Sequence, residues 1–208
     1  MCAPHALGAS AEAWPVSDDA PWTALHEADG VALYTRPFPG SAFPEVRVSG
    51  HVCATLPQLV KFVEDVSAFT TWIPDTAEAR LLATPSAHEQ LYYIRTSMPW
   101  PVKHRDMVYR LTESAGAPGT LSVSIQGVPD YLPPVRGVIR MTHVSGRWTF
   151  RDDAQGTLIG LDMHIEPGGK VPVWLANRRI VAMPGGMLAN LRARFAASCH
   201  AAGPAGSE

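Results

Sequence analysis

The sequence predicts an α+β fold in which a curved antiparallel β-sheet wraps around one long C-terminal helix. From Glu78 to Glu166 almost every segment alternates apolar and polar residues, which is typical of antiparallel strands with one covered face. Beyond this run, apolar residues recur every seventh position and form one helical stripe: Trp174, Val181, Leu188 and Phe195. A sheet that curls around such a helix leaves room for an internal hydrophobic cavity.

Two helices are predicted before the long run of strands. Trp22 to Asp29 is interpreted as a short helix that Gly30 ends, because its apolar residues fall on one face. Residues 56–66 repeat apolar side chains at helical spacing, with Thr55 as the expected N-cap. The last helix is expected over 171–200, and Pro184-Gly185-Gly186 is expected to kink or interrupt it.

The strands are bounded by Pro- and Gly-containing turns, one of them placed at Ser145-Gly146. Nine strands are predicted: 31–36, 43–52, 78–83, 88–98, 105–112, 120–126, 137–144, 147–151 and 157–166. Residues 21–200 are expected to form one domain, with a flexible leader over 1–20 and a flexible tail over 201–208.

Charge and cysteine content narrow the function. A formal net charge of −2 over 208 residues argues against a nucleic-acid binder, which usually has a strong basic excess. Three separated cysteines without a CxxC pair predict no disulfide framework and favour a reducing compartment. We expect a cytoplasmic monomer, with a periplasmic or membrane-associated protein as the alternative if a signal was removed before residue 1.

Four strings of residues carry a family resemblance. They are Trp72-Ile73-Pro74-Asp75, the segment Met98–Tyr109 with PWP and RDMV, the strand Gly137–Arg140 that reads GVIR, and Glu166–Asn177 with PGG and WLAN. In this order they resemble the START (StAR-related lipid-transfer) family over about residues 22 to 196. The resemblance implies the helix-grip fold, a hydrophobic cavity, and binding or transfer of a lipid-like molecule without catalysis or a cofactor.

Strand alternation assigns the cavity wall, because charged side chains prefer water and leave the opposite face inward. Methionines on the last helix complete the wall, since Met adapts to more than one ligand shape. The expected ligand-binding residues are Tyr92, Ile94, Met98, Met107, Tyr109, Leu111, Met141, His143, Met163, Met183 and Met187. An inward His143 would need a hydrogen-bond partner, which a ligand, a water or a tyrosine can supply.

Departures from relatives favour one class of ligand. Some START domains place a carboxylate and an arginine inside the cavity, and the aligned positions here hold Tyr92 and Leu111. Phospholipid-binding members tend to offer a cation where this chain has Phe69. Both features favour a sterol-like, isoprenoid, fatty acyl or aromatic ligand. Arg105 and Asp106 are adjacent on a strand, point to opposite faces, and are interpreted as mainly structural.

An enzyme and a ligand sensor are the two alternatives to a lipid carrier. Some relatives in the wider helix-grip group are polyketide cyclases, aromatases or hydrolases, and Tyr92, Tyr109 and His143 would be the acid and base of such an enzyme. A ligand sensor is the other alternative to a carrier. Asp162, His164 and Glu166 share one face of a strand, but we expect that face to be solvated, so no metal site is predicted.

The route of ligand exchange is expected at mobile glycine-containing segments. The predicted gate is Pro167-Gly168-Gly169 with Lys170, where cations would meet an anionic membrane surface. The loop from Ala115 to Gly119 and the break at Pro184 are further candidates. The cavity is expected to measure several hundred Å³, the usual size of a small-ligand site.

Overall fold

A computed structural model describes residues 20–28 and 30–201, apart from the side chains of residues 115 and 199–201. The leader expected over 1–20 and the tail expected over 201–208 therefore lie almost wholly outside the described residues. Within the described part of the chain, no helix is long and apolar enough to cross a membrane.

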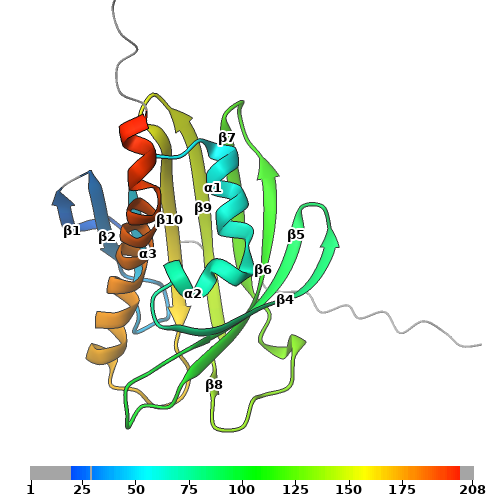
Figure 1. The fold of residues 1–208 in the computed structure, drawn as a ribbon. Helices are drawn as coiled ribbons and strands as arrows, with labels where there is room; N and C mark the ends of the chain where they lie inside the picture. The colour runs from blue at the N-terminus through cyan, green and yellow to red at the C-terminus, as the bar shows by residue number, and fades with distance from the viewer. Residues whose placement is uncertain (1–19, 29, 202–208) are drawn as a thin grey trace, which may run out of the picture.

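One twisted sheet of ten strands forms the body of the molecule (Figure 1). The neighbouring strands pair antiparallel in the order β1-β2-β3-β10-β9-β7-β6-β5-β4, while the short β8 pairs parallel with β6. The strands are β1 (Thr23–Ala28), β2 (Val31–Arg36), β3 (Glu45–Val52), β4 (Thr76–Ser86), β5 (Glu89–Thr96), β6 (Arg105–Ala115), β7 (Thr120–Gly127), β8 (Ile139–Arg140), β9 (His143–Asp153) and β10 (Gly156–Glu166).

The helices lie against one side of this sheet and close its concave face (Figure 1). The long helix α3 (Val173–Ala201) packs along β3 and β2, α1 (Leu56–Glu64) lies over β9 and β10, and α2 (Phe69–Trp72) contacts β4 and α3. Two 3-10 turns, Val66–Ala68 and Pro129–Tyr131, complete the described elements. The predicted α+β fold, a curved antiparallel sheet around a C-terminal helix, is confirmed.

The first predicted helix is wrong. Residues 23–28 form strand β1, which pairs with β2 so that Ala28 lies opposite Val31. In the sequence, Asp29-Gly30 follows this strand, and Asp-Gly is a strong signal for a two-residue hairpin. The helical spacing of three apolar residues was weaker than this turn signal, because sheet hydrogen bonds override a short helical pattern.

The sheet also differs from the prediction between residues 137 and 151. Strand β9 runs without interruption through Ser145 and Gly146, where a turn was expected, and β8 keeps only Ile139 and Arg140. A Cβ added at Gly146 would lie 2.4 Å from the Asp162 carbonyl oxygen of β10. Gly146 therefore permits close strand packing and does not mark a turn.

Helix α3 is continuous through Pro184, so the expected interruption is absent from the described helix. Gly186 meets the loop after α2 at short range, because a Cβ there would lie 2.8 Å from the Pro74 ring. Gly185 has no neighbour within 4 Å of the same added atom. The two glycines therefore have different roles, and only Gly186 is needed for close packing.

Cys53, at the end of β3, is disulfide-bonded. The cysteine pattern was interpreted as giving no disulfide framework, and this disulfide at Cys53 runs against that interpretation. The other two cysteines of the sequence are Cys2 and Cys199, and the structure describes neither side chain. The argument from cysteine content to a reducing compartment loses its basis.

Candidate functional site

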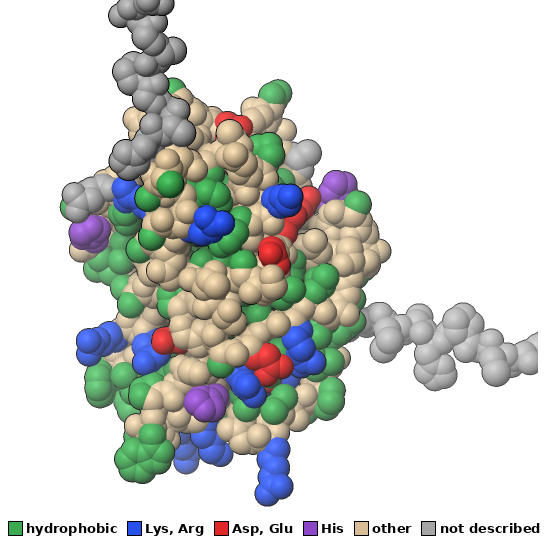
Figure 2. Space-filling model, viewed as in Figure 1, with side chains coloured by type: hydrophobic (Ala, Val, Ile, Leu, Met, Phe, Trp, Pro, Cys, Tyr) green, Lys and Arg blue, Asp and Glu red, His purple; other side chains and the backbone are tan. Residues whose placement is uncertain are grey.

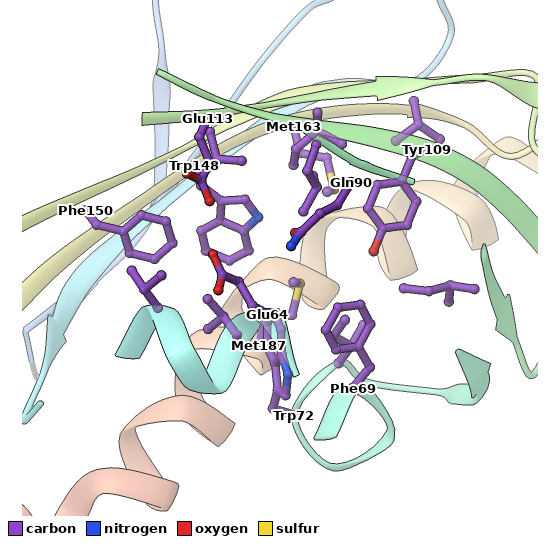
Figure 3. Close-up of a pocket in the computed structure, with 18 of the residues that line it drawn as sticks. Glu64, Phe69, Trp72, Gln90, Tyr109, Glu113, Trp148, Phe150, Met163 and Met187 are labelled. Atoms are coloured by element: carbon purple, nitrogen blue, oxygen red, sulfur yellow. The ribbon is translucent and has the colours of Figure 1, made fainter. Parts of the chain in front are cut away.

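An apolar cavity lies between the sheet and the helices (Figure 3). Its walls come from β5, β6, β7, β9 and β10 on one side and from α1, α2 and α3 on the other. The lining residues are Val60, Val63, Glu64, Phe69, Trp72, Ile73, His88, Gln90, Ile94, Met107, Tyr109, Leu111, Glu113, Leu121, Val123, Ile125, Val144, Trp148, Phe150, Met163, Met183 and Met187. Only Glu64, His88, Gln90 and Glu113 bring charge or an amide to an otherwise apolar or aromatic wall.

A second chamber lies toward the end of the sheet where α3 begins. Its lining includes Met98, Arg105, Met141 and Pro167. Met107 and Met183 line both chambers, so these two side chains stand between them. Each chamber has a volume of about 80 Å³, well below the several hundred Å³ expected. A ligand of ordinary lipid size exceeds both volumes together, so it fits only if the chambers join and the side chains around them move.

The structure brings most of the predicted wall together. Seven of the predicted residues line the first chamber: Ile94, Met107, Tyr109, Leu111, Met163, Met183 and Met187. Met98 and Met141 line the second. Tyr92 lies in the same core, where its ring stacks on Tyr109 with centroids 5.7 Å apart.

The inward orientation predicted for His143 is wrong. Its neighbour Val144 lines the cavity and is 3 % exposed, so strand alternation turns His143 to the opposite face of β9. The error follows from the strand boundary. Residues 141–142 lie between β8 and β9, so the alternation counted from Ile139 does not continue into β9.

Both cavity tyrosines hold their protons. Burial raises the pKa of the Tyr109 hydroxyl far above its ordinary value, and burial followed by the charge of Glu64 raises that of Tyr92 to about 12. The Tyr92 hydroxyl donates to Gln90 Oε1 at 2.9 Å. These hydroxyls can donate hydrogen bonds, but they are poor bases near neutral pH.

Two carboxyl groups face each other across one end of the first chamber (Figure 3). Glu64 ends α1 and Glu113 lies near the end of β6. Burial, then a hydrogen bond with Glu113, then the charge of Glu113 raise the pKa of Glu64 to about 7. With a pKa of about 7, the Glu64 carboxyl exchanges its proton near neutral pH, so it can either donate to or accept from a polar ligand group.

Trp72 adds a donor to the same chamber. Its indole Nε1 is buried and has no hydrogen-bond partner among the described residues, while the Trp72 carbonyl accepts from Asn190 Nδ2 at 3.1 Å. A buried donor without a partner costs free energy, which an acceptor oxygen on a ligand would recover.

The sequence reasoning missed these polar groups for identifiable reasons. Glu113 continues the inward positions of Tyr109 and Leu111, but the predicted strand stopped at residue 112. Gln90 likewise precedes Tyr92 on the inward face of β5. Extending the inward–outward alternation of β5 and β6 by two residues would have found Gln90 and Glu113. The position of Glu64, in contrast, depends on how α1 packs against the sheet.

The comparisons with known proteins decide the family. The START domain family matches residues 15–200. This chain belongs to the START domain family. An uncharacterized protein of Pseudomonas aeruginosa is 33% identical over 172 residues, covering 82% of this chain and 85% of that protein. Bovine phosphatidylcholine transfer protein is 25% identical over 170 residues, with 78% of each chain covered.

Solved structures show the same START fold. A STAR-related lipid transfer protein of Xanthomonas axonopodis superposes with a TM-score of 0.78 at 38% identity, covering 84% of this chain and 98% of that chain. Human StAR-related lipid transfer protein 5 gives a TM-score of 0.77 at 18% identity, over 87% and 89% of the two chains. At that identity the human structure supports the fold alone.

The predicted gate of this START domain lies at one end of the sheet. Pro167 lines the second chamber, Gly168 and Gly169 have φ values of +64° and +61°, and Lys170 lines a neighbouring surface pocket. Gly119 accepts from the backbone of Asp152 at the opposite end of β9, so the loop from Ala115 to Gly119 lies about 30 Å along the sheet from this segment. The loop from Ala115 to Gly119 is therefore a candidate for ligand exchange at the other end of the sheet.

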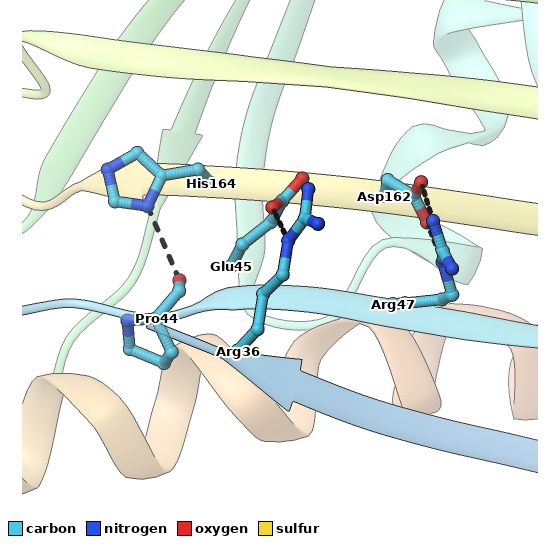
Figure 4. Close-up of polar contacts among 6 residues, drawn as sticks. All are labelled: Arg36, Pro44, Glu45, Arg47, Asp162 and His164. Atoms are coloured by element: carbon cyan, nitrogen blue, oxygen red, sulfur yellow. Dashed lines mark hydrogen bonds and ion pairs between the residues drawn. The ribbon is translucent and has the colours of Figure 1, made fainter. Parts of the chain in front are cut away.

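The outer face of β10, which carries Asp162, His164 and Glu166, is packed differently from the prediction (Figure 4). Asp162, His164 and Glu166 point away from the cavity, as expected, but His164 is 1 % exposed and stacks on Phe38. The expectation that His164 is solvated is wrong. Arg47 engages both carboxylate oxygens of Asp162, at 2.7 and 2.6 Å. Within the described residues, no group of three metal-ligating side chains comes together.

Proposed function

We propose that this START domain binds one largely apolar small molecule in the joined chambers and carries or senses it without catalysis. The apolar cavity supports this proposal, because its polar groups are few and converge on one end. The family membership and the lipid transfer proteins among its relatives support a lipid in general.

The polar end of the first chamber narrows the ligand class. A carboxylate ligand would meet the carboxyl groups of Glu64 and Glu113, so repulsion disfavours a free fatty acid at this end. A hydroxyl or ester oxygen fits better, because it can accept from the Trp72 indole or from the protonated Glu64 carboxyl. We therefore propose a sterol-like, isoprenoid or esterified acyl group inside the cavity.

The enzyme alternative is not favoured. The base assigned to it, His143, lies on the other face of β9. The histidine that does line the chamber, His88, lies against Glu113, with its Nδ1 3.3 Å from Glu113 Oε2. Both tyrosine hydroxyls keep their protons, so neither replaces that base.

The first experiment identifies and then blocks the ligand. Organic extraction of the purified protein followed by mass spectrometry identifies what co-purifies, and fluorescence titration with dehydroergosterol measures binding. We expect Leu121→Trp to fill the chamber and weaken binding, because Leu121 lines it. The matched control Leu25→Trp adds the same side chain on exposed β1 and should bind like the unmodified protein.

The proposal fails if no apolar molecule co-purifies and neither protein binds the probe. It fails equally if Leu121→Trp, shown to be folded by thermal unfolding, binds as well as Leu25→Trp. Transfer of dehydroergosterol between donor and acceptor vesicles then separates a carrier from a sensor. A carrier accelerates the transfer, whereas a sensor binds the probe and leaves the transfer rate unchanged.

We further propose that the end of the molecule near Lys170 contacts an anionic membrane surface. Trp100 and Trp174 are 92 % and 69 % exposed there, beside Lys103 and Lys170. Indole rings favour the membrane interface, and lysines favour anionic lipid. Hydrophobic and basic side chains gather at the lower end of the molecule in Figure 2.

Vesicle sedimentation tests this contact. We expect binding to phosphatidylcholine vesicles only when phosphatidylglycerol is included, and loss of that binding in Trp100→Ser/Trp174→Ser. Tyr131→Ser, at another exposed aromatic residue, is the control and should bind normally. Equal sedimentation with and without the anionic lipid, or of the double variant and the control, would contradict the proposal.

A further inference from the structure

A basic pocket opens beside the beginning of α3. Its lining is Pro101, Val102, Lys103, Arg105, Ile139, Lys170, Pro172 and Leu175, and its volume is about 560 Å³. Three of these eight residues are cationic, and none of the described lining residues is acidic. The chain has only three lysines, and two of them line this pocket.

Arg105 forms the buried part of this pocket. Its side chain is 2 % exposed, and Nη1 donates to the Lys103 carbonyl oxygen at 2.5 Å. The Nε atom is buried without a hydrogen-bond partner among the described residues. An arginine held in this way, without a carboxylate bonded to it in the described structure, carries an uncompensated charge that an anion would stabilise.

The adjacent acidic residue does not neutralise Arg105. Asp106 points to the other face of β6 and pairs there with Arg140, whose Nε lies 2.9 Å from Asp106 Oδ1. Burial lowers the pKa of the Arg105 guanidinium from its ordinary value, which is the effect expected of a charge removed from water.

The helix that borders the pocket adds a positive electrostatic potential, which favours an anion. Leu175 lies in the first turn of α3, a helix of 29 residues with no acidic side chain in that turn, and Pro172 directly precedes the helix. The N-terminal end of a helix carries partial positive charge and unpaired backbone N–H groups that favour anions. Buried Arg105, two lysines and this helix terminus therefore converge on one pocket.

We infer that this pocket binds a phosphate group, from the headgroup of a lipid or from a free phosphate. A tetrahedral oxyanion can accept from a guanidinium, two ammonium groups and backbone N–H groups together. The apolar walls from Val102, Ile139 and Leu175 suit an attached hydrocarbon chain. Arg105 also lines the second chamber, which places the phosphate of an amphiphile next to the cavity. The lipid form of this inference rests on the proposed function.

Calorimetric titration with three soluble probes tests the inference. Inorganic phosphate tests the anion alone, dihexanoylglycerol tests the chains alone, and dihexanoyl phosphatidic acid combines them. A lipid headgroup site binds dihexanoyl phosphatidic acid about tenfold or more tightly than either other probe, whereas a free-phosphate site binds inorganic phosphate as tightly. Both outcomes support a phosphate site in this pocket, and they distinguish a lipid headgroup from a free phosphate.

Variants assign the binding to this pocket. We expect Lys103→Gln/Lys170→Gln to weaken phosphate binding about tenfold, because both exposed ammonium groups are lost. Lys61→Gln, on the exposed side of α1, is the matched control and should bind normally. The inference is overturned if neither phosphate probe binds, or if the double variant and the control bind alike.

Titration with dehydroergosterol in the same variants keeps the two proposals apart. The double variant should bind this uncharged probe like the unmodified protein, since neither lysine lines the cavity. Phosphate binding without dehydroergosterol binding would remove the proposed function and leave the phosphate site. The reverse result would remove the phosphate site alone.

Discussion

The buried ion pair of Asp106 and Arg140 holds part of the sheet in place. Asp106 is 1 % exposed, and both of its oxygens accept from Arg140. The same guanidinium donates to the carbonyl oxygens of Pro129 and Leu132 at 2.5 and 3.0 Å. One buried ion pair thus fixes the segment before β8 against the outer face of β6.

Replacement of Asp106 by asparagine should therefore be strongly destabilising. It leaves the Arg140 charge buried without a counterion, which costs about 3–5 kcal/mol. Asp162→Asn is the matched control, because its pair with Arg47 is partly solvated and contributes about 1 kcal/mol or less. Urea denaturation measures both variants, and equal losses of stability would contradict the structural role given to Asp106.

The Glu64–Glu113 pair makes stability depend on pH. The folded protein holds the Glu64 proton with a pKa of about 7, above the ordinary value of 4.5. This proton therefore stabilises the fold fully below about pH 4.5, and the stabilisation is lost as the pH rises through about 7. Above that pH, two negative charges face each other at the end of the chamber.

Glu113→Gln should raise the melting temperature above about pH 7 and leave it nearly unchanged near pH 4.5, because it removes one of the two facing charges. Glu89→Gln, which removes a carboxylate from an exposed pair with Arg110, serves as the control. Thermal melts across this pH range are the measurement. A gain of the same size at both pH values would show that charge repulsion is not its cause.

At the scale of elements, close approach decides where each helix and strand can lie. Gly186 lets α3 pack against Pro74 after α2, and Gly146 lets β9 lie against β10. Both glycines have the sequence signature of a turn or helix break, yet both lie inside regular elements.

Alanine at the two adjacent glycines of α3 should have opposite effects. Gly186→Ala forces the loop at Pro74 to move and should cost about 1–3 kcal/mol. Gly185→Ala meets no atom within 4 Å and should stabilise the helix by about 0.5–1 kcal/mol, since alanine loses less backbone entropy. Denaturant unfolding of both variants checks the signs, and equal signs would contradict this packing.

At the scale of the whole molecule, two small chambers together form the space for a ligand. Met107 and Met183 stand between chambers of about 80 Å³ each, one with an acidic pair and the other with Arg105. Unbranched methionine side chains change rotamer at low cost, so a ligand can displace them without moving the sheet.

Met183→Ala should join the chambers and accelerate dehydroergosterol binding, while lowering stability by about 2 kcal/mol through the lost contacts. Leu188→Ala, one turn along α3 in the solid core, should lose stability by about 2–5 kcal/mol without faster binding. Stopped-flow fluorescence separates the two. Equal association rates would show that Met183 does not divide the cavity.

The sheet-and-helix architecture and most of the cavity wall follow from the order of residues along the chain. Local alternation suffices where a strand continues unbroken, and for this reason Ile94, Tyr109 and Met163 were placed correctly on inward faces. The four segments that resemble the START family likewise predicted the START fold, because turns and strands depend on short stretches of neighbouring residues.

Which polar groups come into contact depends on how distant segments of the chain pack together. His143 lies on the outer face because residues 141–142 belong to no strand, so the inward–outward alternation of β8 does not continue into β9. Strand β1 forms despite its helical pattern of apolar residues because its backbone pairs with β2. The acidic pair joins α1 to β6, and the basic pocket joins β6 to α3. Contacts between elements distant in the chain depend on packing angles and burial, which local periodicity does not encode.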